Sequence, residues 1–250
     1  IRVAFFSLLG HWPVIGVALS ADMQTLHVAL NNNQIHQLSI TSIMDYLTIK
    51  AESFITVKTG ITSIKSVQLC DYSMSLVVLA FPDSVRVYLP GDKLKTIAEF
   101  VSESPLIAVS SHEWTFYIAI ASKETLTVYM FNDNCEYEKI TSKKFKGAIA
   151  DLNFVSRKLM CISVRNNSFI IHISGKVCSE IENTKHTSET TAAINGRIFL
   201  LPNVYRLEDW KERIKTLQEQ GKYREALSIA LSIYNEDSEE FECNDNREDI

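Results

Sequence analysis

The sequence predicts a mainly β protein, a partial β-propeller with WD40-like blades followed by the first helix hairpin of an α-solenoid. Apolar, strand-forming runs follow one another from Val14 to Tyr205. They recur in groups about every 40–50 residues, the repeat length of a four-stranded blade. Near Arg206 the hydrophobic period changes from two to 3.6. We therefore expect blades over residues 1–206, the start of a solenoid over 207–234 and an acidic disordered tail over 235–250.

The first evidence for the propeller is a repeated unit of two strands, a tight polar turn and a third strand. Because each blade buries its faces only against its neighbours, such units are stable as a stacked ring. Four units and a degenerate fifth are predicted: Val14–Leu19, Leu26–Leu30 and Gln34–Ile40; Ser63–Leu69, Leu76–Ala80 and Val85–Leu89; Leu106–Ser110, Thr115–Ala121 and Leu126–Phe131; Ala148–Phe154, Leu159–Val164 and Phe169–Ile173; Thr191–Asn195, Arg197–Leu200 and Val204–Leu207. An ordinary β-sandwich remains the alternative fold.

The change of period predicts two amphipathic helices. The first carries its apolar stripe at Trp210, Ile214 and Leu217, and the second at Tyr223, Ala226, Leu227, Ala230 and Tyr234. Gly221 stands between them, where a left-handed residue ends a helix. We expect small alanines to allow close helix packing and Trp210 to anchor the hairpin on the last blade.

Composition sets limits on function. The 250 residues are 46% hydrophobic, which is ample for a folded core, while only 8 glycines are present and no glycine-rich phosphate loop occurs. Enzymes that bind nucleotides through such loops are disfavoured. The chain begins at Ile1 and its first apolar residues are interpreted as strands rather than a secretory signal, so we expect a piece of a longer protein.

Charge is concentrated at the end of the chain. The net charge is −5, but eight of the acidic residues lie within 235–250 beside one arginine, which leaves residues 1–234 at +2. The folded part therefore lacks the basic surplus that binds a nucleic-acid backbone, and no nucleic-acid partner is expected. The one compact basic stretch, Lys143-Lys144-Phe145-Lys146, is predicted to be a solvated loop, with contact to an acidic partner or lipid headgroups as its alternative.

The cysteines and histidines do not form a known catalytic or metal-binding motif. The five cysteines (Cys70, Cys135, Cys161, Cys178 and Cys243) lack a C-x-x-C pair, which favours a reducing compartment and buried structural thiols at Cys161 and Cys178. His27 and His36 are predicted to be exposed or hydrogen-bonded, and His112-Glu113-Trp114 to be a turn with an anchoring tryptophan rather than a general-acid site. We therefore predict no catalytic residue, no metal and no cofactor, and we assign no partner-binding residue.

The junction between blades and helices resembles a known family. Asn195-Gly196-Arg197-Ile198-Phe199-Leu200, Trp210-Lys211-Glu212-Arg213-Ile214 and the run Gly221–Ala230, with its Y-x-E-A-L-x-x-A element, are similar to the propeller-to-solenoid passage of the vacuolar protein sorting subunit-eight family of the CORVET tethering complex. Upstream, Ile149–Phe154 and Phe169–Ile173 resemble that family's last full blade. The resemblance is best over residues 148–234. The family's long solenoid and zinc-binding RING are not in this sequence.

The resemblance implies a non-catalytic scaffold on the cytoplasmic face of early and late endosomes. Such a subunit binds an activated endosomal Rab GTPase and sister subunits, contacts the membrane peripherally, and so promotes fusion and endosome-to-vacuole or lysosome protein transport. Other propeller–solenoid proteins, such as HOPS, nucleoporin or ciliary transport subunits, share versions of these motifs and remain open. A propeller-type hydrolase or lyase with acids or histidines in its central channel is a third possibility, which the apolar first strands disfavour.

Overall fold

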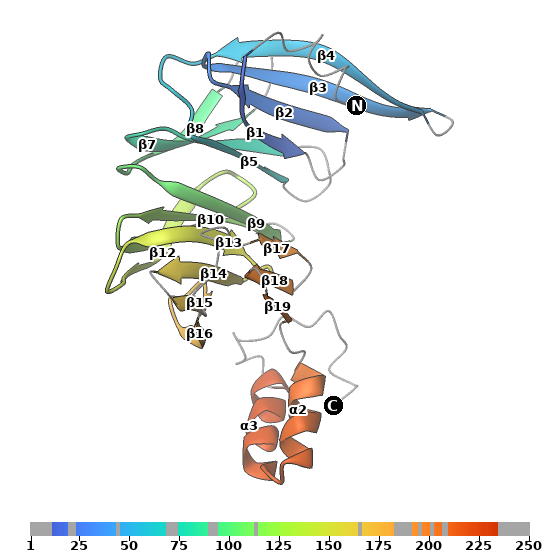
Figure 1. Ribbon diagram of the computed structural model, residues 1–250, viewed down its shortest axis with the longest axis vertical. Helices are drawn as coiled ribbons and strands as arrows, with labels where there is room; N and C mark the ends of the chain where they lie inside the picture. The colour runs from blue at the N-terminus through green and yellow to red at the C-terminus, as the bar shows by residue number, and fades with distance from the viewer. Residues whose placement is uncertain are drawn as a thin grey trace. The chain divides into compact units, whose positions relative to one another are not determined.

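Among the residues that it describes, the computed structural model contains five antiparallel sheets and a helix pair (Figure 1). It describes residues 12–19, 24–43, 46–68, 75–89, 95–112, 115–164, 167–182, 192–194, 197–200, 203–206 and 210–234. The chain divides into two compact units, residues 1–152 and 153–250. The acidic tail, residues 235–250, and the start of the chain before Trp12 lie outside the described residues.

The first unit contains three four-stranded meanders, each with its strands in chain order. Sheet A consists of β1 (Val14–Leu19), β2 (Thr25–Leu30), β3 (Gln34–Ile43) and β4 (Tyr46–Thr56). Sheet B consists of β5 (Ser63–Gln68), β6 (Ser75–Ala80), β7 (Ser84–Leu89) and β8 (Lys95–Val101). Sheet C consists of β9 (Leu106–His112), β10 (Thr115–Ser122), β11 (Thr125–Phe131) and β12 (Tyr137–Lys144).

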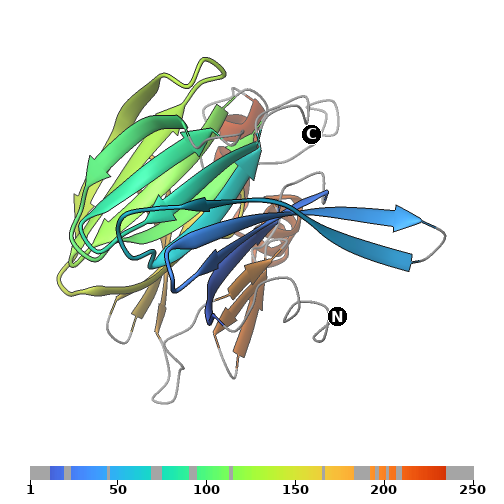
Figure 2. The same cartoon turned by 90° about the horizontal axis from the view of Figure 1, so that it is seen from above.

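The sheets of the first unit stack through their first strands. Strand β1 contacts β5, and β5 contacts β9, so sheets A, B and C follow one another as blades do (Figure 1). Seen from above, the β3–β4 hairpin extends past the ends of β1 and β2 (Figure 2). The predicted blade architecture is confirmed.

Sheet B shows why its strands are apolar on both sides. Leu76 to Ala80 of β6 are all fully buried. Val78 belongs to the apolar cluster shared with sheet C, whereas Leu79 belongs to the cluster shared with sheet A. Because side chains alternate between faces and both faces are covered, the strand is hydrophobic throughout.

The sequence predicts only three strands for each of the first four units, whereas the structure has a fourth strand in each of these sheets. Strands β8 and β12 are largely exposed, and β12 has the polar sequence YEKITSKK. An edge strand at the rim buries little surface, so it lacks a clear apolar run. Lys143 and Lys144 belong to β12 and Phe145 is buried at 9% exposure, so the predicted basic loop is wrong.

Turns in this glycine-poor chain use other residues in the left-handed region. Asn33, Ser104, Lys123 and Cys135 have φ values of 66°, 45°, 52° and 61°. Asn33 and Lys123 lie in turns that the sequence predicts, between β2 and β3 and between β10 and β11. Asparagine adopts this region more readily than most residues, which explains its place in the first turn.

The remaining strands form a four-stranded sheet D and a three-stranded sheet E. Sheet D consists of β13 (Ile149–Phe154), β14 (Leu159–Val164), β15 (Asn167–His172) and β16 (Val177–Glu182). Every residue of β14 is buried. Sheet E has three strands, β17 (Ala192–Ile194), β18 (Arg197–Leu200) and β19 (Asn203–Arg206), as expected for a degenerate fifth unit.

Two helices, α2 (Trp210–Glu219) and α3 (Tyr223–Tyr234), pack on each other as the sequence predicts. The apolar stripe predicted for α3 is only partly correct. Ala226 is buried and Ala230 half-buried, but Tyr223 and Leu227 are 67% and 59% exposed. The inward stripe follows Ala226, Ile229 and Ala230 instead, since small residues permit close approach of the helices. The side chain of Trp210 lies outside the described part of the chain.

Gly221 ends α2 in a Schellman motif. Its φ is +74°, its N–H donates to the Gln218 carbonyl at 3.0 Å, and the Lys222 N–H donates to the Leu217 carbonyl at 2.8 Å. The position predicted for a left-handed residue is confirmed.

We expect Gly221→Ala to destabilise the hairpin by about 1 kcal/mol, because a Cβ is strained at positive φ even where space is free. Urea unfolding followed by far-ultraviolet circular dichroism measures the effect. Gly60→Ala is the matched control, since the nearest atom to its Cβ lies at 3.9 Å and its φ is not positive. Equal stability of the two variants would contradict the assignment.

Candidate interaction surfaces

An open cleft lies between the outer part of sheet B and sheet C. We call it the rim cleft; its volume is about 340 Å³. Its lining combines apolar side chains with hydroxyl groups: Phe100, Val101, Ser102, Glu103, Ile120, Ser122, Thr125, Thr127 and Tyr129. Val101 is 93% exposed at its edge, whereas Phe100 and Ile120 are buried. The cleft therefore offers an apolar floor beneath a polar wall.

The polar wall follows from the register of sheet C. Ile120 pairs with Thr127 and Ser122 with Thr125, so these four side chains share the face turned toward sheet B. Toward the middle of the sheet the same face carries Phe116 and Ile118. The face thus changes from apolar in its interior to hydroxyl-bearing at its rim.

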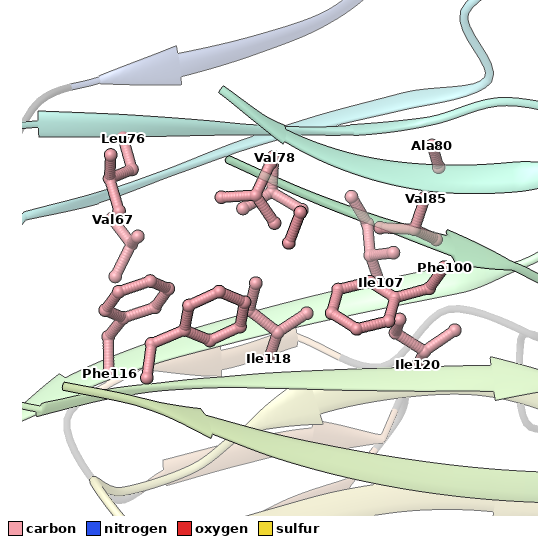
Figure 3. Close-up of a cluster of buried hydrophobic side chains, with 13 residues drawn as sticks. Val67, Leu76, Val78, Ala80, Val85, Phe100, Ile107, Phe116, Ile118 and Ile120 are labelled. Atoms are coloured by element: carbon pink, nitrogen blue, oxygen red, sulfur yellow. The ribbon is translucent and has the colours of Figure 1, made fainter. Parts of the chain in front are cut away.

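An aromatic cluster holds the two sheets together beside the rim cleft. Phe100 of β8 stacks on Tyr129 with ring centroids 4.1 Å apart, and Phe116 stacks on Phe131 at 4.4 Å. Tyr137 meets Phe131 at 5.2 Å. Figure 3 shows Val67, Leu76 and Val78 of sheet B pointing toward Phe116 and Ile118 of sheet C. Stacked rings and close aliphatic packing make this part of the protein rigid.

Charges around the rim cleft are paired. Lys123 Nζ lies 2.7 Å from Glu103 Oε2, and the Ser122 hydroxyl donates to the Glu103 carbonyl at 2.7 Å. Arg86 Nε donates to Glu99 Oε1 at 2.8 Å on the neighbouring strands. Burial raises the pKa of the Tyr129 phenol, with a further contribution from Tyr137, so this hydroxyl stays protonated. The cleft thus presents hydroxyl groups, the ion-paired Glu103 and apolar side chains to solvent.

The structure places the predicted site residues apart from one another. His112 ends β9, while Glu113 and Trp114 lie outside the described residues. Cys161 is fully buried in β14, which confirms its predicted burial. Cys178 is only half-buried on β16, so the prediction that it is buried is wrong. His36 lies 3.4 Å from the Gln34 side chain. No group of three or more metal-ligating side chains occurs among the residues that the structure describes.

His27 differs from its prediction. It is 3% exposed on the face of sheet A turned toward sheet B, and neither ring nitrogen has a hydrogen-bond partner within the described ranges. Alternation in sequence suggested an exposed position, but both faces of this strand are covered. Burial lowers the pKa of His27 from its ordinary value of 6.5, because a buried imidazolium loses its hydration.

A pH dependence of stability follows from His27. Below pH 6.5 His27 binds a proton in the unfolded chain, whereas the buried imidazole of the folded chain stays neutral until the pH reaches its lowered pKa. The free energy of unfolding should therefore fall as the pH drops from 7.5 to the pKa of His27 in the folded state. His27→Leu should flatten this dependence, measured by urea unfolding at several pH values. His36→Gln should flatten it less, because His36 is only half-buried, although burial lowers its pKa as well. An unchanged slope in His27→Leu would contradict this origin.

Two apolar surfaces face solvent. On β1 the exposed residues are Val14, Ile15, Val17 and Leu19, and Trp12 precedes them. On α3 they are Tyr223, Leu227 and Leu231, spaced four residues apart and therefore on one stripe. Sequence periodicity marks both segments as apolar but does not show which positions a neighbour covers. No helix among the described residues has both the length and the hydropathy to cross a membrane.

Comparison with known proteins identifies the fold. The chain is similar to the propeller of Dos1 (15% identity, TM-score 0.50, covering 69% of this chain and 48% of that one) and to Sqt1 of Saccharomyces cerevisiae (12%, 0.51, 68% and 48%). It is also similar to the β-propeller domain of Cps50 (Swd1) from Myceliophthora thermophila (11%, 0.57, 79% and 71%). No family model and no curated protein matches the chain. The chain thus has a β-propeller fold and spans about half the length of the first two structures.

Proposed function

We propose that this chain is a protein-interaction scaffold of the propeller–solenoid type, and that it serves in an endosomal vesicle-tethering complex of the CORVET kind. The observation that carries the proposal is the order of its parts: stacked four-stranded blades, a shortened sheet E and then the α2–α3 hairpin. Repeated sheets and helix pairs present extended surfaces, which suit binding of partners.

The finer part of the proposal rests on the junction residues. The Trp210–Ile214 and Gly221–Ala230 motifs that resemble the tethering family fall on α2 and α3, and Arg197–Leu200 falls on β18, immediately before them. The expected partners are sister subunits of the tether and an activated endosomal Rab GTPase, with peripheral contact to the endosomal membrane.

The character of the described surface agrees with a role without catalysis. The rim cleft combines ion-paired charges, hydroxyls and apolar side chains, which can hold a partner's side chain. A hydrolase or lyase of the propeller type needs convergent acids or histidines, and the first strands β1 and β9 carry mostly apolar or small residues over Val14–Leu19 and Leu106–Ser110.

The test is binding by the natural polypeptide purified from its source cells. It should co-purify with tether subunits in stoichiometric amounts and bind purified endosomal Rab loaded with a non-hydrolysable GTP analogue in preference to the same Rab loaded with GDP. The GDP form is the matched control for non-specific adsorption. Co-purification with nuclear-pore, ciliary or HOPS subunits instead, or equal binding of both nucleotide forms, would contradict the CORVET-type role.

A further inference from the structure

The rim cleft continues onto strand β12 as a ladder of polar residues, which we call the polar ladder. It consists of the cross-strand pairs Thr125 with Lys144, Thr127 with Ser142 and Tyr129 with Lys139. Residues that lie directly opposite each other share a face of the sheet, so all six lie on the face of sheet C turned toward sheet B. The hydroxyl oxygens of Thr127 and Ser142 are 3.4 Å apart, which agrees with this placement. The polar ladder therefore has a lysine at each end and hydroxyl groups in between.

The polar ladder carries positive charge and no carboxylate. Glu138, the acidic residue of β12, is opposite Met130 and lies on the other face of the sheet. Lys139 is exposed and has no ion-pair partner among the residues that the structure describes. Lys144 Nζ lies 3.6 Å from Glu124 Oε2, but both side chains are exposed, and such contacts contribute little to stability. Both lysines are therefore available to an anionic ligand.

The floor of the rim cleft between the two lysines is apolar. Ile120 is directly opposite Thr127, at the middle of the polar ladder, and Ile120 and Phe100 are 4% and 8% exposed. The cleft volume of about 340 Å³ is within the range of small-ligand sites, about 300–1,000 Å³. Glu103 supplies the one carboxylate among the described lining residues, and Lys123 already neutralises it at 2.7 Å. The cleft thus offers an apolar contact flanked by two cations.

The spacing of the two lysines fits an extended peptide. Thr125 and Tyr129 are four residues apart, so the lysine positions opposite them are separated by about 13 Å along the strands. An extended peptide has the same rise per residue, and every second side chain points to the same side. Its residues i, i+2 and i+4 therefore match one lysine, the apolar floor and the other lysine in turn.

We propose that the rim cleft binds an extended acidic peptide of the pattern acidic–x–aliphatic–x–acidic, in which x is any residue. Its two carboxylates pair with Lys139 and Lys144, and its aliphatic side chain enters between them and packs toward Ile120. The hydroxyls of Thr127 and Ser142 hydrogen-bond to the peptide backbone. Charge complementarity supports this occupant, since the polar ladder presents two cations without a carboxylate. The proposal names a ligand for a cleft to which the proposed scaffold function gives a role, and it rests on that function.

The test is binding of a synthetic peptide to the purified natural polypeptide. A fluorescein-labelled peptide, Gly-Glu-Ser-Leu-Ser-Glu-Gly, is titrated, and fluorescence anisotropy measures its dissociation constant. The matched control peptide, Gly-Glu-Leu-Ser-Ser-Glu-Gly, has the same composition and charge but turns its leucine to the opposite side. The control should bind at least about tenfold more weakly, because its leucine is not buried while both carboxylates are paired. Equal binding of the two peptides, or no binding of the first, overturns the proposal.

Two protein variants locate the binding site. Lys139→Gln removes a cation and Thr127→Val removes a hydroxyl with little change of shape, and each should weaken binding of the first peptide about threefold or more. Lys146→Gln, at an exposed lysine outside the polar ladder, is the matched control and should leave binding unchanged. Circular dichroism checks that each variant is folded. If all three variants bind the peptide alike, it binds elsewhere and the assignment to the rim cleft is wrong.

This proposal and the proposed function fail separately. A polypeptide that co-purifies with tether subunits but does not bind the peptide would keep the proposed function and contradict this ligand. Phosphatidylserine vesicles that bind the unmodified protein but not Lys139→Gln, without peptide binding, would assign the lysines to a membrane surface and also overturn the proposal.

Discussion

Phe116→Ala should lower the free energy of unfolding by about 3–5 kcal/mol. Phe116 is fully buried between sheets B and C and stacks on Phe131 at 4.4 Å. Truncation removes the ring from the cluster that joins the two sheets and leaves a cavity, and rigid neighbours cannot collapse to fill it. This loss is a large share of the stability of an ordinary domain.

Chemical unfolding of the purified chain, followed by tryptophan fluorescence and circular dichroism, measures the loss. Tyr223→Ala is the matched control, because it truncates an aromatic ring that is 67% exposed on α3, and it should change the free energy by less than about 0.5 kcal/mol. If Phe116→Ala lowered the free energy of unfolding no more than Tyr223→Ala does, the B–C interface would not be packed as described.

Leu79→Ala should cost about 2–5 kcal/mol through the other face of sheet B. Leu79 is fully buried in the cluster with Ala29, Ile64 and Phe81, where sheets A and B meet. The substitution tests whether the A–B interface contributes about as much to the free energy of unfolding as the B–C interface does, as a stack of blades requires.

The control for Leu79→Ala is Leu227→Ala, the same chemical change at a 59% exposed position on α3. Differential scanning calorimetry should show a clear fall in unfolding temperature for the first variant and almost none for the second. Equal falls would mean that sheet A does not pack on sheet B through β6.

Most of the fold was accessible to sequence reasoning because buried strands have strong local signals. The segments Leu76–Ala80 and Leu159–Val164 are buried throughout and were predicted within a residue or so of their observed bounds. Gly221 was placed correctly as the end of α2, because a left-handed cap has a specific chemical requirement.

Features that depend on neighbours in space were missed. Strand β12 lacks an apolar run because its side chains are largely exposed, and its basic end is therefore predicted as a loop. His27 looked exposed, since alternation says which residues share a face but not whether that face is covered. The rim cleft is formed by side chains that are separated in sequence by up to about thirty residues and that stacking of sheets B and C brings together.

The same limit applies to the apolar surfaces. Periodicity gave α3 one stripe, yet the structure divides its apolar residues between an inward set around Ala226 and an exposed set at Tyr223, Leu227 and Leu231. The bulge in β1 moved Val14 onto the face of Val17, and no period-two pattern reports that.

A cryo-electron microscopy map of the natural polypeptide tests the central claim, blades stacked through their first strands, most directly. The account predicts β1, β5 and β9 as consecutive inner strands of a radial array, with Phe116 between sheets B and C. Sheets packed face to face as two layers of a sandwich, with β1 at an outer edge, would contradict it.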